Sequence, residues 1–189
     1  MRLFIAVDLD EPVRAAAARL VKRLAKALAA ARPAADVRWV EADRMHLTLR
    51  FLGEVAEPMA TALQTAFTPV MSTPSFDIEL AGVGTFPPSG PPRVIWIGLI
   101  EGAAQLETLH HEVGTRLKRL RIEDEDRPFR AHLTVGRFRR PGVAVHRRSL
   151  SAVAPATIGR CRIDHVTLYQ SKLSPKGSVY TALVAPTLA

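Results

Sequence analysis

Hydrophobic residues recur with two different spacings along the chain, and these spacings predict helices and strands in a mixed order. Leu20, Leu24 and Leu28 lie four residues apart in an alanine-rich segment, which is typical of an amphipathic helix, and Asp10 is a suitable N-cap for it. Helices are predicted over 11–32, near 57–68 and near 102–120. Strands are predicted over 2–9, 36–40, 46–53, 75–86, 93–100, 129–138, 161–173 and 178–185.

The order of these elements favours an α+β fold over a parallel doubly wound sheet. Several strands follow one another through short turns, as at 174–177, and such hairpins join antiparallel strands. The segment 87–92 contains four prolines and is predicted to be a loop. No linker-like segment divides the two halves. We therefore expect one domain over 1–189, built of two lobes that share an interface.

A short motif occurs twice, as HLTL beginning at His46 and as HLTV beginning at His132. Because side chains alternate along a strand, His46 and Thr48 are expected on one face and their apolar neighbours on the other. The same alternation puts His132 and Thr134 on one face. A single histidine in a strand is usually a surface or core residue. A duplication kept for packing alone has no reason to retain both polar residues, so we interpret the pair as a functional site.

Arginines extend both polar faces. Counting two residues at a time from the histidines adds Arg44 and Arg50 to the first face and Arg130 to the second, so each copy reads Arg-x-His-x-Thr. Phe51 and Arg137 are expected on the opposite faces, unless a β-bulge changes the register. We take Arg50 and Arg130 as candidate substrate-binding residues.

Two histidines on different strands suit an in-line displacement at phosphorus. The nucleophile and the leaving oxygen lie on opposite sides of the phosphorus atom, so a neutral imidazole can take one proton while a protonated imidazole gives another. Imidazole is suited to both tasks because its reference pKa is about 6.5. The hydroxyls of Thr48 and Thr134 can donate to the non-bridging phosphate oxygens, and a guanidinium can offset their charge.

The overall charge favours a polyanionic partner. Lys and Arg outnumber Asp and Glu by 26 to 18, which gives a net charge of +8 and suits RNA or nucleotides. The one cysteine, Cys161, cannot form an internal disulfide, and no apolar segment is long enough to cross a membrane, so we expect a cytoplasmic protein. The sequence has no H-E-x-x-H motif, cysteine cluster or P-loop, which argues against a zinc site or a P-loop nucleotide site.

The doubled motif and its flanks resemble the two-histidine (2H) phosphoesterase superfamily, and in particular its bacterial RNA 2′,3′-cyclic phosphodiesterase branch, also called 2′-5′ RNA ligase-like. The similarity covers nearly the whole chain, from RLFIAVDL at 2–9 through FPPSGPPRVIWIG at 86–98 to VTLYQSKLSPKGSVY at 166–180. The resemblance implies a bilobal α+β fold, in which two antiparallel sheets with flanking helices are related by a pseudo-two-fold axis around a central cleft.

The resemblance also implies roles for the motif residues. His46 would be the proton donor, His132 the proton acceptor, and Thr48 and Thr134 the ligands of the phosphate oxygens. Nothing in the sequence itself fixes the direction of proton transfer. Members of the family work without a metal or another cofactor, so none is expected here.

The function implied is hydrolysis of an RNA 2′,3′-cyclic phosphate end to a 2′-phosphomonoester, with ATP-independent 2′-5′ RNA ligation as a side reaction. The expected partners are RNA ends, including tRNA fragments, or cyclic nucleotides, and the protein is expected to act as a monomer away from membranes. Two alternatives stay open: a noncatalytic RNA-binding module, and a related activity on small cyclic nucleotides. An aromatic fraction of 6%, without an RNA-binding aromatic motif, argues against the first alternative.

Overall fold

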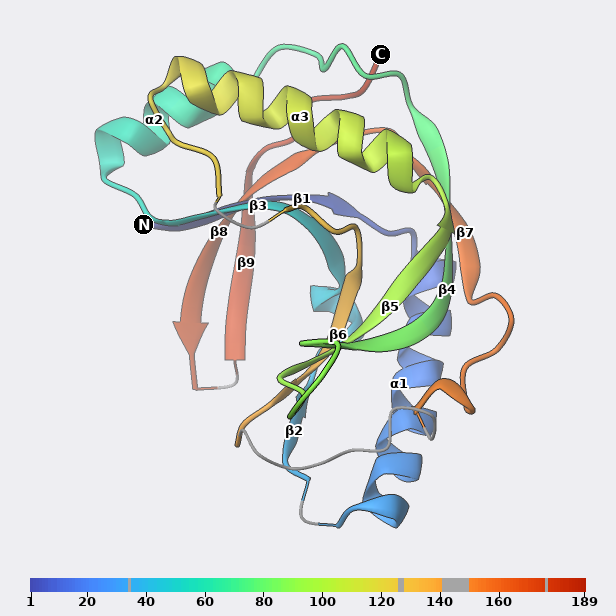
Figure 1. Ribbon diagram of the computed structural model, residues 1–189. Coiled ribbons are helices and arrows are strands. Elements are labelled where there is room, and N and C mark those ends of the chain that lie inside the picture. Colours follow the sequence, from blue (N-terminus) through green and yellow to red (C-terminus); the bar gives the residue numbers. More distant parts are fainter. Residues whose placement is uncertain (34, 126–127, 141–149, 176) are drawn as a thin grey trace.

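The computed structural model describes residues 1–33, 35–125, 128–140, 150–175 and 177–189, and it has an α+β fold (Figure 1). Its elements in chain order are β1 (Arg2–Asp8), α1 (Glu11–Ala31), β2 (Val37–Trp39), the short 3₁₀ helix η1 (Ala42–Arg44), β3 (His46–Glu54), α2 (Glu57–Ala66), β4 (Phe76–Phe86), β5 (Val94–Glu101), α3 (Ala103–Arg119), β6 (Leu133–Phe138), β7 (Gly159–Ile163), β8 (Thr167–Ser174) and β9 (Gly177–Val184). The predicted fold class is confirmed, and each predicted helix is present.

The strands form two antiparallel sheets with related architecture. The first sheet has the order β3-β1-β8-β9 and the second the order β2-β6-β5-β4-β7. In both sheets the strand of the H-x-T motif, β3 or β6, pairs with the strand that precedes a long helix, β1 or β5. Beyond that pair, β8 and β9 correspond to β4 and β7. This correspondence is the pseudo-two-fold relation that the resemblance implied.

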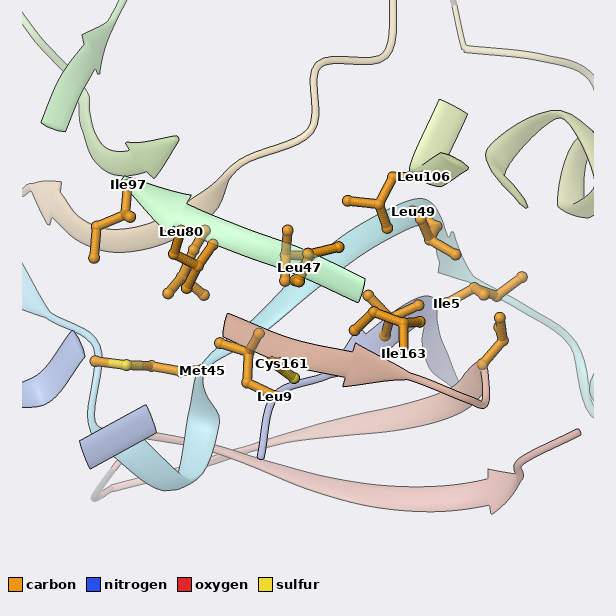
Figure 2. Close-up of a cluster of buried hydrophobic side chains, with 14 of the residues drawn as sticks. Ile5, Leu9, Met45, Leu47, Leu49, Leu80, Ile97, Leu106, Cys161 and Ile163 are labelled. Carbon is orange, nitrogen blue, oxygen red and sulfur yellow. The ribbon is translucent and has the colours of Figure 1, made fainter. Parts of the chain in front are cut away.

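Each long helix packs against the sheet of the other lobe. Helix α1 follows β1 of the first sheet and contacts β7 of the second, whereas α3 follows β5 of the second sheet and contacts β3 of the first (Figure 1). One hydrophobic cluster continues through both sheets, and Figure 2 shows Leu47 of β3, Ile97 of β5 and Ile163 of β7 within it. Burial of each large aliphatic side chain contributes roughly 1.5–3 kcal/mol. Separation of the lobes would therefore expose a core that neither lobe covers alone.

Helix α1 begins where the sequence predicts. The Asp10 side chain accepts a hydrogen bond of 2.9 Å from the backbone N–H of Val13, and Pro12 lies in the first turn. Its buried face includes the leucine repeat of the sequence, and Leu24 is fully buried. The predicted N-cap and apolar stripe are both confirmed.

Two strands differ from their predicted bounds. The segment predicted as one strand over 161–173 is two strands, because β7 pairs with β4 in the second sheet and β8 pairs with β1 in the first. The chain changes sheets between them, which the apolar pattern alone does not reveal. Strand β6 begins at Leu133, so His132 directly precedes the strand instead of lying within it.

Candidate active site

The first H-x-T motif lies at the start of β3. His46 is opposite Asp8 of β1, and Thr48 is opposite Ala6. Residues directly opposite each other on antiparallel strands present their side chains on the same face. The predicted common face of His46 and Thr48 is confirmed, and Asp8 shares it.

A β-bulge follows this motif. The register of β3 against β1 shifts by one residue after Thr48, so that Arg50 lies opposite Ile5 and Phe51 lies opposite Phe4. The extra residue reverses the alternation of side chains. Phe51 therefore returns to the face of Thr48 and Arg50 leaves it. The predicted faces of both residues are wrong, because strict alternation does not anticipate the bulge.

Arg50 makes contacts behind the first sheet. Its side chain is 3% exposed. The guanidinium donates a hydrogen bond to the carbonyl of Glu123 and lies 3.7 Å from the Asp124 carboxylate and 3.9 Å from that of Glu125. These contacts attach the segment after α3 to β3. Because Arg50 points away from the motif face, its predicted substrate-binding role is withdrawn.

The second motif is followed by a bulge at the same place. Thr134 lies opposite Trp96 of β5, and after a shift of one residue Arg137 lies opposite Val94. The burial of the two copies also agrees: the five residues after each histidine are buried, half-buried, buried, buried and exposed in turn. Arg137 therefore joins the face of Thr134, contrary to prediction, at the position that Phe51 has in the first lobe.

Arg137 is the functional candidate that alternation misses. Burial is the main cause that lowers the pKa of both His46 and His132, and the charge of Arg137 lowers both further. The Arg137 guanidinium is therefore near enough to both imidazoles for its charge to act on each of them. The sequence does contain a signal for its orientation, because Gly136 is an isolated glycine in a predicted strand, and such a glycine often marks a bulge.

Each histidine is held by a backbone group two residues before it. His132 Nδ1 lies 2.6 Å from the carbonyl oxygen of Arg130, and His46 has the equivalent hydrogen bond to the backbone of Arg44. A carbonyl oxygen can only accept, so Nδ1 of His132 donates and its Nε2 is left for chemistry. Arg130 contributes this carbonyl, and its side chain is exposed.

Aromatic rings surround His46. Phe4 stacks on the imidazole with ring centroids 4.8 Å apart, and Tyr180 meets it edge-on at 5.3 Å. Burial lowers the pKa of His46 to about 4, although the charge of Asp8 and the hydrogen bond to the Arg44 backbone oppose this shift. The carboxylate opposite His46 thus stabilises the protonated imidazole.

Asp8 is held in a network of its own. Thr167 Oγ1 donates to its carboxylate at 2.9 Å, Tyr169 donates at 2.8 Å, and His165 Nε2 lies 3.4 Å away. Burial raises the pKa of Asp8, but the hydrogen bonds from these three side chains outweigh it, so the pKa lies below its usual value. Hydrogen bonds that His165 donates to the carboxylates of Asp8 and Asp164 raise its pKa to about 9. Its position beside Asp8 connects His165 to the site.

The surroundings of His132 differ. The Phe86 ring meets its imidazole edge-on at 5.0 Å, and Trp96 lies beyond, 5.2 Å from Phe86. Gly84 leaves the room for this arrangement, since a Cβ there would collide with the Trp96 ring. Burial lowers the pKa of His132, and the hydrogen bond to the Arg130 backbone opposes it. Among the described residues, no carboxylate acts on the pKa of this imidazole.

The two threonines have hydroxyls available to a ligand. Thr48 and Thr134 are half-buried, and neither hydroxyl has a hydrogen-bond partner within the described part of the chain. Among the same residues, no group of three or more His, Cys, Asp or Glu side chains is arranged to hold a metal ion. None of the described helices is long and apolar enough to cross a membrane.

Comparisons with known proteins identify relatives of this chain in sequence and in fold. The model of the 2′-5′ RNA ligase superfamily matches residues 12–174. An RNA 2′,3′-cyclic phosphodiesterase of Archaeoglobus fulgidus is 38% identical over 97% of this chain and 98% of that protein. The crystal structure of TT0787 of Thermus thermophilus has a TM-score of 0.73 at 32% identity, covering 99% of this chain and 97% of that one. E. coli LigT complexed with 3′-AMP has a TM-score of 0.71 at 28% identity, covering 99% and 97%.

Proposed function

The chain belongs to the 2′-5′ RNA ligase superfamily, and from this premise we propose that it hydrolyses the 2′,3′-cyclic phosphate at the end of an RNA strand to a 2′-phosphomonoester. The observation that carries the proposal is the repeated H-x-T arrangement, with two backbone-held histidines and the Arg137 charge acting on both. The curated relative from A. fulgidus has the cyclic phosphodiesterase activity by name, and LigT binds a ribose phosphate.

In the proposed mechanism each side chain has one task. His132, neutral, accepts a proton at Nε2 from a water molecule as the water oxygen bonds to phosphorus. The bond from phosphorus to the 3′ oxygen breaks, and His46, protonated, gives its proton to that oxygen. Thr48 and Thr134 donate to the non-bridging oxygens, and the Arg137 guanidinium offsets the charge that develops on them.

The assignment of His46 as the donor is supported by its neighbours. Asp8, directly opposite, favours the protonated form of His46, and no carboxylate in the described part of the chain does so for His132. The pKa of His46 is about 4 before substrate binds. A phosphate anion between the histidines raises the pKa of both, because an opposite charge stabilises imidazolium. His46 then receives its proton in the complex.

The same geometry supports ligation as a slow side reaction. A 5′-hydroxyl in place of water, with the same roles for the histidines, gives a 2′-5′ linkage without ATP. The proposal covers residues 1–189 as one domain of two lobes, because the helices of each lobe pack on the other lobe's sheet. It further includes a cytoplasmic monomer acting on RNA ends such as tRNA fragments, and the buried free thiol of Cys161 is consistent with a reducing compartment.

The direct test uses an RNA oligonucleotide with a 2′,3′-cyclic phosphate end, incubated with the protein in EDTA. We expect a 2′-phosphate as the dominant product by phosphorus NMR. His46→Ala and His132→Ala should each lower kcat/KM by at least about 10², the usual scale of general acid–base catalysis. His111→Ala, an exposed histidine of α3, is the matched control. Near-normal turnover in either variant, or a requirement for a divalent ion, would contradict the proposal.

A dominant 3′-phosphate would leave two-histidine chemistry standing but reject the orientation of the cyclic phosphate. Binding without any turnover by the native chain would instead identify a noncatalytic RNA-binding module.

A further inference from the structure

Two arginines face each other across the strands next to the second motif. Arg38 of β2 lies directly opposite Arg137 of β6, on the face that carries Thr134. Like charges directly opposite one another destabilise a sheet. Within the described residues, neither guanidinium has an ion pair with a carboxylate. The two guanidinium groups are therefore available to bind an anionic ligand.

A third arginine reaches the same place from the other lobe. A Cβ at Gly177, in the turn between β8 and β9, would collide with the guanidinium groups of both Arg38 and Arg44. Glycine is favoured there by its φ of +117°, and the close approach shows that both guanidinium groups lie against this turn. Arg44 is paired with Glu41 at 3.3 Å, so its charge is partly neutralised. No carboxylate of the described residues neutralises the charge of Arg38 in this way.

Arg38 also lines a pocket at this end of the site. The pocket has a volume of about 470 Å³ and is lined by Arg38, Arg139, Leu173, Ser174, Pro175 and Gly177. Its lining comes from β2 of the second sheet and from residues at the ends of β8 and β9 of the first, so both sheets contribute to it. Arg139 is paired with Asp36 at 3.7 Å. Among the described residues, the lining of this pocket therefore includes one arginine, Arg38, whose charge no carboxylate pairs with.

The chemistry of an RNA end determines which anion would bind there. A 2′,3′-cyclic phosphate occupies the 2′ and 3′ oxygens of the terminal ribose, so the next phosphate of the strand is on the 5′ oxygen of the same nucleoside. The two phosphates are about one ribose apart. Side chains directly opposite on antiparallel strands start from Cα atoms about 4.5–5.5 Å apart. Arg137 and Arg38 are spaced for two such neighbouring phosphates.

We propose that Arg38, supported by Arg44, binds the 5′-phosphate of the terminal nucleoside while Arg137 acts on the cyclic phosphate. This inference rests on the proposed function and deepens it, because it names the substrate class. The enzyme distinguishes a strand end, which carries a 5′-phosphate, from a nucleoside 2′,3′-cyclic phosphate, which does not. Small cyclic nucleotides are then poor substrates, although they fit the chemical step.

The kinetic test compares three substrates: adenosine 2′,3′-cyclic phosphate, its 5′-phosphorylated form, and the dinucleotide ApA with a 2′,3′-cyclic end. In the native protein, kcat/KM should rise by about tenfold when the 5′-phosphate is added, the scale of one charge-assisted hydrogen bond. The ratio should fall to about one in Arg38→Gln. Arg162→Gln removes the same charge from an exposed arginine of β7 that pairs with Asp77, and it should keep the tenfold ratio.

A binding measurement separates this inference from the proposed function. By calorimetry, adenosine 2′,5′-bisphosphate should bind about tenfold more tightly than adenosine 2′-phosphate, and Arg38→Gln should abolish the difference. If the native protein hydrolyses all three substrates but the 5′-phosphate changes neither kcat/KM nor affinity, the subsite is rejected and the activity stands. A gain with ApA but not with the 5′-phosphate would assign selectivity to the upstream nucleoside and also reject it. A difference in affinity without turnover would keep the subsite and reject the activity.

Discussion

His46 and His132 occupy equivalent positions in the two lobes, but their surroundings differ in kind. Phe4 and Tyr180 pack around His46, with the Asp8 carboxylate opposite it. His132 has one aromatic neighbour, Phe86, and the arginines of β2 and β6 lie farther along its sheet. The repeated backbone thus presents one imidazole beside a carboxylate and the other on the cationic side of the site.

This difference explains how a symmetric arrangement can perform an asymmetric reaction. In the proposed mechanism, the two bulged strands bring two imidazoles and two hydroxyls to one phosphate. Equal surroundings would give the histidines equal proton affinities, whereas an in-line reaction needs one donor and one acceptor. Asp8 raises the pKa of His46, whereas Arg137 lowers the pKa of both histidines, so the carboxylate is the group that breaks the symmetry. The residue that follows each bulge on the motif face also differs between the lobes. It is Phe51 in the lobe of His46 and Arg137 in the lobe of His132.

The largest expected effect contrasts two arginines that alternation assigns to the wrong faces. Arg137→Gln should lower kcat/KM on a cyclic-phosphate-ended RNA by about 10², because the developing charge loses its guanidinium, while stability changes little. Arg50→Gln should do the reverse. It removes buried contacts with the segment after α3, so it should lower the free energy of unfolding by about 2 kcal/mol with activity largely retained at 25 °C.

Steady-state kinetics and urea unfolding of the two variants measure both effects. Loss of activity in Arg50→Gln with unchanged stability would restore the face predicted by simple alternation and reject the functional importance of the bulges.

Removal of one hydroxyl in each lobe tests whether the lobes share one phosphate. Thr48→Val and Thr134→Val should each lower kcat by about tenfold, since each loses a hydrogen bond to a charged oxygen. Valine suits a strand, so the melting temperature should stay nearly constant. A tenfold loss in one variant and none in the other would show that only one lobe binds the phosphate oxygens.

The smallest effect concerns Asp8 and pH. Burial holds the pKa of both histidines below 6.5, so the pH profile of kcat/KM should be bell-shaped with its maximum on the acid side of pH 6.5. Asp8 raises the pKa of His46. Asp8→Asn should therefore reduce the protonated fraction of His46 and lower kcat/KM at pH 7 by about threefold.

Asp164→Asn is the matched control, because Asp164 contacts His165 at 2.5 Å and has no place opposite His46. An equal loss in both variants would mean that Asp8 acts through the fold near His165 instead of through the charge on His46.

The sequence predicts the fold well where local signals decide it. The capped, alanine-rich α1 and the hairpin of β8 and β9 follow from periodicity and turn residues. The exchange of helices between lobes does not follow, since an amphipathic face does not identify the sheet it packs on. The division of 161–173 between two sheets is hidden for the same reason, because the residues of a strand do not identify the sheet in which it pairs.

The candidate site is predictable to the extent that the repeat defines it. The H-x-T pairs are visible because both copies retain the same polar residues at a spacing that suits a strand. Arg50 and Arg137 are assigned to the wrong faces because one inserted residue in the ladder moves every later side chain to the other face. The role of Asp8 has no signal in the sequence, because its relation to His46 depends on the register of β1 against β3.

The most direct test of the division between the lobes uses a cyclic substrate whose 3′ bridging oxygen is replaced by sulfur. A thiolate leaves without a proton, so the donor is no longer needed, whereas water must still be deprotonated. His46→Ala should lose at least about 10² in kcat/KM on the oxygen substrate and recover most of it on the sulfur substrate. His132→Ala should be slow on both. Recovery of His132→Ala instead of His46→Ala would reverse the roles, and recovery of neither would contradict acid–base catalysis shared between the lobes.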